Sequence, residues 1–439
     1  MGETPYERLK TLQQAVWSEN GGRKPRIKED LLVLSPDKDP FYSGSKTDVA
    51  QAEWFAEVFG QTRGAHLRRI HYRLVARGDV LRGDGRLYEN DKDSWGYLNK
   101  ASRNARYLGL VDPEAIVDRR NPEPHIYMTG WGFSPEWSYE LETNRLDRIY
   151  SALSNWRSLV DVETEVSGYI HEETLQPYHV EVWAEKTTMN DVLVPLCASL
   201  GANYVSGAGY QSITAMVGLL RDRVERLGKP CRVLYVSDYD AAGRNMPKQM
   251  SRHMEFWSER YGTEHDIRVE PIVMTTEQAE KYPAAPDSGA VELDAMEELD
   301  PGLLRRIVSE HAAQFRDFDL ESKVSEQEDQ AEEVIREAVE EAIFIELEAI
   351  KGLKAEAEEI YARYRPRLGA LASELDAELA PLDRRLETLQ QAAREKLEGL
   401  DPALPPLPEG EPEEEPEDDG WLFDSRRDYL EQLEHYKAQ

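Results

Sequence analysis

Two aspartates separated by one residue follow an apolar run in the middle of the chain. Residues 233–236 read Val-Leu-Tyr-Val, and Asp238 and Asp240 come shortly after them. The run is typical of a buried parallel strand, and Gly243 opens an expected helix over 244–260. Side chains at positions i and i+2 of a strand point the same way. The two carboxylates would therefore converge at the carboxyl end of the strand, where α/β sheets bind ligands.

A glutamate ends a second expected strand. His179–Ala184 alternates like a strand, Glu185 and Lys186 follow it, and a helix is expected from Met189 to Leu200. Further strands are expected at 203–205 and 267–274, with a helix at 212–227. This βαβαβαβ order predicts a parallel sheet with helices on both faces. Three carboxylates at one sheet edge would suit Mg²⁺ or Mn²⁺, which prefer oxygen ligands. The alternative for Asp238 and Asp240 is a solvated turn.

These motifs resemble a known family. A Glu after one strand and Asp-x-Asp-x-x-Gly after a later one resemble the Toprim domain of topoisomerases, primases and some nucleases. Ala-Glu-Lys at 184–186 and Ser-Gly-Ala-Gly-Tyr at 206–210 are most similar to the A subunit of topoisomerase VI, a relative of the meiotic double-strand-break transesterase. The resemblance implies that Glu185, Asp238 and Asp240 hold magnesium beside a scissile phosphate. Ala241-Ala242 departs from the family, which often has proline after the second Asp.

The segment before this region predicts a second domain. A helix is expected to start at Thr47 or Asp48 and end at Phe59, a second to span 66–77 and end at Gly78, and a hairpin to form around Gly83-Asp84-Gly85. A third helix, capped by Asp93, runs to Tyr107, and a strand is expected at 115–118. Helix, helix, hairpin and basic helix indicate a winged-helix module.

Arg68 and Tyr72 lie four residues apart on the second helix, on one helical face. In the family that the chain resembles, the nucleophile is a Tyr four residues after an Arg. A guanidinium beside the phenol would favour phenolate and stabilise charge on the phosphorane. His71 could accept the phenol proton or be a packed residue. The alternative for Tyr72 is a core or rim residue.

Charge is distributed unevenly along the chain. The formal net charge is −32, yet residues 61–110 carry 11 bases and 5 acids. A basic segment in an acidic chain is a candidate phosphate footprint, the alternative being chance clustering on a solvated helix. We expect Glu185 to act in catalysis as well as in metal binding. The expected DNA contacts are Arg69, Arg73, Arg77, Arg82, Arg103, Arg106 and Lys186.

The remaining segments predict supporting structure. The first 46 residues read as a polar arm with one strand-like run, Asp30–Leu34. Leu141–Leu159 is expected to be helical, and Val291–Ala295 to be an edge strand whose Glu292 or Asp294 approaches the metal, followed by a helix over 302–315. Apolar residues at steps of three and four over 321–400 predict a helical hairpin that turns near Pro366 and Gly369. The acidic, proline-rich segment 401–420 is expected to be disordered. Residues 421–436 are expected to form a short docking helix. Removal of residues 401–439 is expected to leave folding unchanged.

We therefore expect an α+β multidomain protein: a winged-helix domain, a Toprim α/β domain with a parallel sheet, and a C-terminal helical coiled coil. The expected ranges are an arm and helix at 1–60, the winged-helix domain at 61–130, a connector at 131–175, the Toprim domain at 176–318, the hairpin at 319–400 and the acidic linker and tail helix at 401–439.

The expected function is magnesium-dependent cleavage of double-stranded DNA by tyrosine transesterification, similar to a type IIB topoisomerase A subunit. The resemblance implies a homodimer, in which Tyr72 of one protomer acts with the metal site of its partner. An ATPase partner would be a separate subunit, because the chain has no Gly-x-x-x-x-Gly-Lys-Ser/Thr loop. The alternatives are a Toprim nuclease that hydrolyses DNA within a plasmid or phage defence complex, and a non-enzymatic DNA-binding assembly protein. No long apolar segment is present, so no membrane contact is expected, and Cys197 and Cys231 are expected to be reduced core residues of a cytoplasmic protein.

Overall fold

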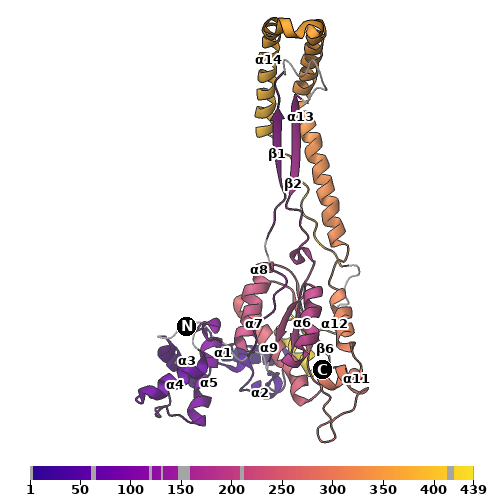
Figure 1. The fold of residues 1–439 in the computed structure, drawn as a ribbon. Coiled ribbons are helices and arrows are strands. Elements are labelled where there is room, and N and C mark those ends of the chain that lie inside the picture. The colour runs from indigo at the N-terminus through magenta and orange to yellow at the C-terminus, as the bar shows by residue number, and fades with distance from the viewer. Residues whose placement is uncertain are drawn as a thin grey trace. The chain divides into compact units, whose positions relative to one another are not determined.

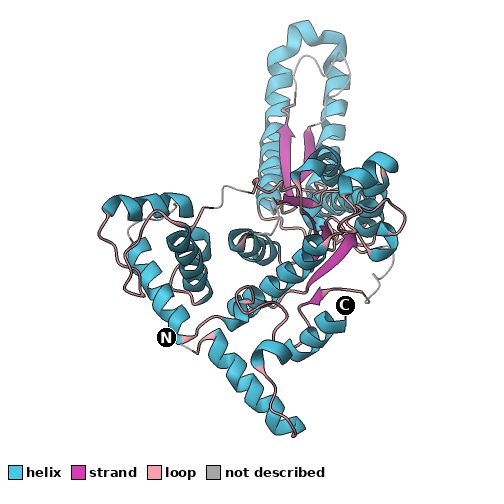
Figure 2. Cartoon of the chain, turned by 90° about the horizontal axis from the view of Figure 1, so that it is seen from below, coloured by secondary structure: helices cyan, strands magenta, loops and turns pink. Residues whose placement is uncertain are grey.

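A computed structural model describes residues 3–60, 66–117, 121–129, 132–146, 159–207, 212–412 and 420–438. The protein is α+β, with helices and strands in both of its two compact units (Figure 2). The first unit contains residues 1–130, 176–317 and 411–439, and the second contains residues 131–175 and 318–410. This division differs from the six expected ranges, because the expected connector belongs with the C-terminal hairpin.

A five-stranded sheet forms the centre of the first unit. Its strands lie in the order β4-β3-β5-β6-β7, and the first four are parallel. Their bounds are β3 His179–Ala184, β4 Asn203–Ser206, β5 Cys231–Val236, β6 Ile267–Val273 and β7 Phe423–Asp424. The predicted parallel sheet is thus confirmed, and each of its four strands matches its expected range within two residues. The antiparallel edge strand β7 was not expected.

Helices cover both faces of this sheet. Alternate residues of a strand point to opposite faces, and Val182 and Trp183 of β3 accordingly belong to different cores. The first core contains residues of α6 (Asn190–Ser199) and α12 (Leu303–Ala313), and the second contains residues of α7 (Ile213–Gly218) and α9 (Ala241–Tyr261) (Figure 1). After α7 the chain continues through a π-helical turn, Leu219–Val224, into α8, Glu225–Leu227.

The helix–helix–hairpin–helix order before the sheet is confirmed. Its helices are α3 Lys46–Phe59, α4 Leu67–Arg77 and α5 Lys92–Tyr107, and a Leu81–Leu87 bridge closes the hairpin. Apolar residues of all three helices, including Phe55, Ile70 and Leu98, form a core of their own. Gly78 ends α4 in the left-handed conformation, as predicted.

The two expected helix caps were wrong. Ser45 caps α3, and Asp48 completes its capping box from the third helical position. Asp91 rather than Asp93 caps α5, accepting a hydrogen bond from the Ser94 N–H at 2.7 Å. In both cases a residue two or three positions earlier in the chain supplies an oxygen in the geometry that caps require.

The first 46 residues are also different from expectation. A 16-residue helix, α1 Pro5–Asn20, and a short α2, Ile27–Asp30, replace the polar arm, and no strand forms at Asp30–Leu34. Thr4 and Glu7 form a capping box at the start of α1, a Thr-x-x-Glu signal that was visible in the sequence. The strand expected at 115–118 is absent over 115–117, where a 3₁₀ turn, Pro113–Ala115, precedes extended backbone, and Asp118 lies outside the described residues.

The second unit combines a helical hairpin with a β-hairpin. Helices α13 (Leu320–Tyr364) and α14 (Leu368–Glu398) confirm the predicted hairpin and its turn near Pro366. Strands β1 (Glu136–Thr143) and β2 (Val160–Ser167) pair antiparallel, and Leu141 and Val162 pack against the apolar stripe of the helices. The helix expected at 141–159 is therefore wrong at both ends, and 147–158 lie outside the described residues. None of the helices within the described ranges is long and apolar enough to cross a membrane.

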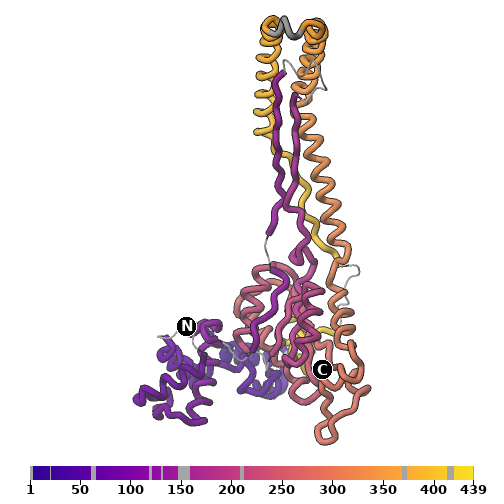
Figure 3. The backbone as a smooth tube through the Cα atoms, in the orientation of Figure 1, coloured from indigo at the N-terminus to yellow at the C-terminus, as the bar shows by residue number. Residues whose placement is uncertain are grey.

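The acidic segment expected to be disordered is packed over its first part. Residues 401–412 follow an extended path (Figure 3), and Leu404 and Leu407 pack against the second unit's cores. The Tyr169 hydroxyl donates to the Pro405 carbonyl, and the Gly410 N–H donates to the Leu175 carbonyl at 2.9 Å. Bulky side chains in an acidic, proline-rich sequence thus hold this part in place. The rest of the expected disorder, 413–419, lies outside the described residues.

The last residues of the chain are part of the first unit's core. Trp421 and Phe423 are buried, and the expected docking helix forms only as α15, Tyr429–Ala438. The Tyr429 hydroxyl contacts the Arg252 guanidinium and donates to the Leu31 carbonyl at 2.7 Å. Arg252 is fully buried and also pairs with Asp39 at 3.2 Å. The structure does not support the expectation that removal of residues 401–439 leaves folding unchanged, because removal would leave Arg252 without Tyr429 and the β6 edge without β7.

We expect Phe423→Ala to lower the free energy of unfolding by about 3–5 kcal/mol, because it empties a core position. Leu299→Ala, at a side chain that is 60% exposed, is the matched control, with an expected loss within about 0.5 kcal/mol. Denaturant unfolding of the full chain measures both values. Equal, small losses would show that the C-terminal strand is not part of the core.

Candidate functional site

Two of the predicted carboxylates meet at the carboxyl edge of the parallel sheet. Glu185 follows β3 directly, and its N–H donates to the Val236 carbonyl at the end of β5 at 2.9 Å. Its Oε2 accepts a hydrogen bond from the Asp238 N–H at 3.2 Å. Both side chains are buried, with exposed fractions of 8% and 4%. The parallel register of β3 and β5 therefore holds the two acids against each other.

Asp240 lies at this edge and also caps a helix. It is the N-cap of α9, and its Oδ1 accepts a hydrogen bond from the Gly243 N–H at 2.5 Å. Gly243 is required here, since a Cβ atom would lie 2.1 Å from the Asp238 carbonyl oxygen. The charge of Asp240 acts on Glu185 and raises its pKa. The third predicted carboxylate is thus near the other two, with one oxygen committed to the helix.

Lys186 lies among carboxylates rather than on an open DNA-facing surface. Its Nζ is 2.6 Å from Asp238 Oδ2 and 3.5 Å from Asp294 Oδ2, and it also contacts Glu292 Oε2. Burial alone would lower the pKa of Lys186, but hydrogen bonds to Asp238 and Glu292 raise it above the ordinary value. The ammonium group is therefore a built-in counter-charge for this acidic edge.

Glu292 and Asp294 reach the edge from a helix start rather than from a strand. The expected strand at 291–295 is reduced to one bridge between Val291 and Tyr239, and α11 spans Leu293–Leu299. The Leu293 N–H donates to Asp238 Oδ1 at 2.8 Å. Glu292 and Asp294 both contact Lys186 at this edge, and their approach to a metal stays a prediction.

Burial and like charges perturb the acids at this edge. Burial, followed by the charges of Asp238 and Asp240, raises the pKa of Glu185 to about 6. Burial also raises the pKa of Asp238, while the bond to Lys186 opposes that rise. Carboxyl groups with raised pKa values can exchange protons near neutral pH, which is a property of general acids and bases.

The donor chemistry fits a divalent cation, although the geometry is not that of a closed three-ligand site. Within the described ranges, no set of three or more His, Cys, Asp and Glu side chains is placed to hold one metal ion. Asp238 is engaged by Lys186, whereas Glu185 and Asp240 form no ion pair among the described residues. Mg²⁺ is usually held by one or two carboxylates and completes its shell with water and phosphate oxygens. The acids at this edge supply oxygen ligands of the kind that such a site uses.

Tyr72 lies on the exposed face of α4. Its side chain is 56% exposed, and Arg68, Arg69 and Arg73 on the same helix are exposed too. Arg68 and Tyr72 are one helical turn apart, as predicted, so both can reach the same ligand. In the described structure, Tyr72 forms no hydrogen bond with Glu185, Asp238 or Asp240. The structure therefore does not assemble the tyrosine and the carboxylates into one site within a single chain.

His71 is a packed residue rather than a proton acceptor for Tyr72. It is buried, its Nδ1 lies 2.7 Å from the Tyr88 hydroxyl, and its Nε2 lies 3.1 Å from Asn90 Oδ1. Both ring nitrogens are thus engaged by the hairpin, and its ring also meets Trp95 edge to face. Of the two roles left open by the sequence, the structure favours packing.

The expected phosphate-binding arginines differ in availability. Arg82 is buried, pairs with Asp93 at 2.5 Å and Asp84 at 2.6 Å, and lies over the Tyr97 ring. The prediction that Arg82 contacts DNA is therefore not supported by its placement, since it joins the hairpin to α5. Arg77 is exposed and lies 3.5 Å from Asp79, while Arg103 and Arg106 are half-buried on α5. The exposed basic face is formed by Arg68, Arg69 and Arg73.

The glycine-rich turn that contributed to the resemblance is described only in part. The Gly207 N–H donates to the Ala184 carbonyl at 2.9 Å, which places this turn beside the end of β3. Ala208, Gly209 and Tyr210 lie outside the described residues.

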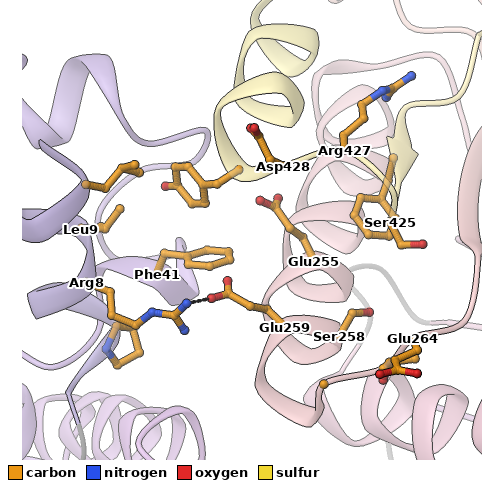
Figure 4. Close-up of a pocket in the computed structure, with 16 residues that line it drawn as sticks. Arg8, Leu9, Phe41, Glu255, Ser258, Glu259, Glu264, Ser425, Arg427 and Asp428 are labelled. Atoms are coloured by element: carbon orange, nitrogen blue, oxygen red, sulfur yellow. Dashed lines mark ion pairs between the residues drawn. The ribbon is translucent and has the colours of Figure 1, made fainter. Parts of the chain in front are cut away.

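Sequence reasoning missed a cavity of about 650 Å³ in the first unit (Figure 4). Leu9, Phe41 and Tyr429 form part of its apolar lining, and Arg8 pairs with Glu259 across it. Burial raises the pKa of Glu255 there to about 7 despite its bonds to Arg252. The lining comes from α1, Phe41, the end of α9 with the turn after it, and the last 20 residues, so no local pattern in the sequence could have indicated it.

No protein-family model matches the chain, and no curated protein or solved structure matches it either.

The raised pKa of Glu185 predicts a pH-dependent stability cost. A carboxyl whose folded pKa is about 6 and whose unfolded pKa is about 4.3 destabilises the fold as pH rises through that window. Glu185→Gln removes this cost, so it should gain stability relative to wild type between pH 5 and pH 8 by about 1 kcal/mol. Denaturant unfolding in chelator measures the gain, with the exposed Glu280→Gln as control. A pH-independent difference would contradict the raised pKa.

Proposed function

We propose that the protein is a magnesium-dependent DNA-cleaving enzyme with a winged-helix domain and a Toprim domain, acting by tyrosine transesterification. The observation that carries the proposal is the pairing of Glu185 and Asp238 at the carboxyl edge of a parallel sheet. Such edges are ligand sites in open α/β sheets. The same unit presents an exposed tyrosine on a basic helix.

Each side chain then has a role that its chemistry supports. The Tyr72 oxygen attacks the phosphorus atom, the bond from phosphorus to the 3′ oxygen breaks, and the 3′ oxygen takes up a proton as it leaves. A 5′-phosphotyrosyl link and a free 3′ hydroxyl result. Arg68 stabilises the charge that develops on the phosphorane. Glu185 and Asp240, with Asp238 beside them, would hold a divalent cation, which supplies charge neutralisation at the phosphate.

A homodimer accounts for the separation of tyrosine and carboxylates. Tyr72 has no contact with the acidic edge among the described residues of one chain. Tyr72 of the partner subunit would complete the site, and two such sites would cut both strands. The proposal also includes resealing of the DNA by the reverse of this reaction, and an ATPase carried by a separate subunit.

A hydrolytic nuclease is the second candidate, and a specific observation favours it. Both nitrogens of His71 are engaged, so this neighbour of Tyr72 does not serve as its base. Glu185, with its pKa raised to about 6, could accept a proton from an attacking water instead. In this case Tyr72 would be a DNA-contacting residue, and the second unit would dock a defence-complex partner.

Tyr72→Phe separates the two candidates, because phenylalanine keeps the ring and removes the attacking oxygen. If Tyr72 is the nucleophile, this variant should bind DNA and cut nothing, while wild type quenched with detergent carries protein on 5′ ends. Arg68→Ala should lose about 3–4 kcal/mol of transition-state stabilisation, roughly a hundred- to a thousand-fold in rate. The exposed Arg226→Ala is the matched control. Wild-type cutting by Tyr72→Phe, together with an inactive Asp238→Asn, would establish hydrolysis instead.

The exposed basic face of α4 predicts a salt-dependent contribution to DNA binding. Arg69→Ala should weaken binding to every DNA sequence and reduce the slope of log affinity against log salt by about 1, since one phosphate contact is lost. Titration of a labelled duplex at several salt concentrations measures the slope. Arg82→Ala should instead lower stability, because it removes the buried guanidinium that joins Asp84 to Asp93 and leaves both with only the more distant Arg86. An unchanged slope for Arg69→Ala would place the DNA elsewhere.

A further inference from the structure

The first two helices of the chain form an open pocket that is rich in lysine. The pocket has a volume of about 570 Å³ and is lined mainly by residues of α1 and α2. Lys10, Lys24 and Lys28 belong to its lining, and Glu29 is the only acid among the described lining residues. Glu29 lies 3.4 Å from Arg26, so its charge already has a partner. In a chain with a net charge of −32, this concave surface carries a local excess of positive charge.

Each of the three lysines lies over an aromatic ring. The distances from Nζ to the ring centroid are 4.4 Å for Lys10 over Tyr6, 5.3 Å for Lys24 over Trp17 and 5.8 Å for Lys28 over Tyr42. At such distances the negative face of the ring attracts an ammonium group. The rings of Tyr6 and Tyr42 also meet edge to face, with their centroids 5.2 Å apart. Lys10 and Lys28 therefore belong to one continuous surface.

The rings hold these ammonium groups without neutralising them. All three lysines are exposed, and none of them forms an ion pair among the described residues. Lys24 donates a hydrogen bond to Gln14 Oε1 at 3.2 Å, which is an uncharged partner. The acid nearest in sequence to Lys10 is Glu7, whose carboxylate completes the capping box of α1. A lysine that is already ordered over a ring loses less conformational freedom when it binds an anion.

This surface suits an extended polyanion better than a small enclosed ligand. Pockets for small molecules bury most of the surface of their ligand, whereas the three lysines here are exposed to solvent. A DNA backbone carries one phosphate charge after another and is attracted by such a group of cations. Basic side chains interleaved with aromatic rings are also a feature of surfaces that bind nucleic acid. Residues 23–28, with four bases and no acid, extend the positive charge beside the pocket.

We propose that the pocket lined by α1 and α2 binds the phosphate backbone of DNA through Lys10, Lys24 and Lys28. The inference rests on the proposed function, because it adds a second phosphate-binding surface to the basic face of α4. It gives the first 30 residues a role in holding the DNA substrate. The phosphates bound here are distinct from the one that is cleaved, so this surface contributes affinity and not chemistry.

The salt dependence of DNA binding tests the inference. A labelled duplex is titrated with the full-length protein in chelator, which prevents cleavage, at several salt concentrations. The combined variant Lys10→Gln, Lys24→Gln, Lys28→Gln should reduce the slope of log affinity against log salt by about 3, since three phosphate contacts are lost. The same three positions changed to Arg keep their charge and should keep the wild-type slope. The exposed Lys281→Gln is the matched control and should also leave the slope unchanged.

Thermal unfolding shows whether each variant folds, and the three single Lys→Gln variants replace the combined one if it does not. Each single variant should reduce the slope by about 1. A wild-type slope for the folded Gln variants, while wild type binds DNA, would overturn this inference alone. Failure of wild type to bind duplex DNA at any salt concentration would overturn the proposed function as well. Poly-glutamate that displaces the duplex as effectively as an unlabelled duplex of equal charge would assign the surface to an acidic protein and overturn the inference.

Discussion

The parallel pairing of β3 with β5 is the constraint on which the candidate site depends. Ala184 lies opposite Val236 in the register, and the ladder continues through the bond from the Glu185 N–H to the Val236 carbonyl at 2.9 Å. A shift of one residue would turn Glu185 to the other face of the sheet, because side chains alternate along a strand. The shift would also exchange Val182 and Trp183 between two separate cores. Packing on both faces therefore fixes the register, and the register places the acids together.

Electrostatic balance at the sheet edge follows from this placement. Burial of Glu185 and Asp238 is unfavourable and raises the pKa of both, and the nearby charge of Asp238 adds to the rise for Glu185. Lys186 compensates one side, and its position directly after Glu185 means that the same strand delivers an acid and a counter-charge. The opposite balance exists on α4, where exposed arginines surround Tyr72. An acidic sheet edge attracts cations, and a basic helix attracts phosphates. The sheet edge and α4 therefore favour ligands of opposite charge.

The path of the chain explains why its acidic end is not a separate tail. After Asp317 the chain leaves the first unit, builds α13 and α14, and returns at Glu411. Its last residues add β7 to the sheet and bring Tyr429 to Arg252. A buried guanidinium needs partners. Here Glu255 lies one turn along the same helix, whereas Asp39 and Tyr429 come from distant parts of the chain. The buried charge of Arg252 thus joins α9 to segments near the beginning and the end of the chain.

Local pattern in the sequence determined the strands of the parallel sheet, the three helices and hairpin before it, and the long helical hairpin. Each of these elements has its own periodicity or turn signal, and Glu185, Asp238 and Asp240 follow from strand ends alone. Only the tertiary structure decided the rest. Strand β1 does alternate, with Trp137, Tyr139 and Leu141 on one face, but the apolar surface that this face packs against is supplied by α13 and α14. Strand β7 likewise forms because the edge of β6 is available. The contacts of Lys186 and the engagement of His71 depend on residues 17 to 108 positions away, and the burial of Arg82 depends on how the hairpin meets α5. No local period in a sequence records such pairings.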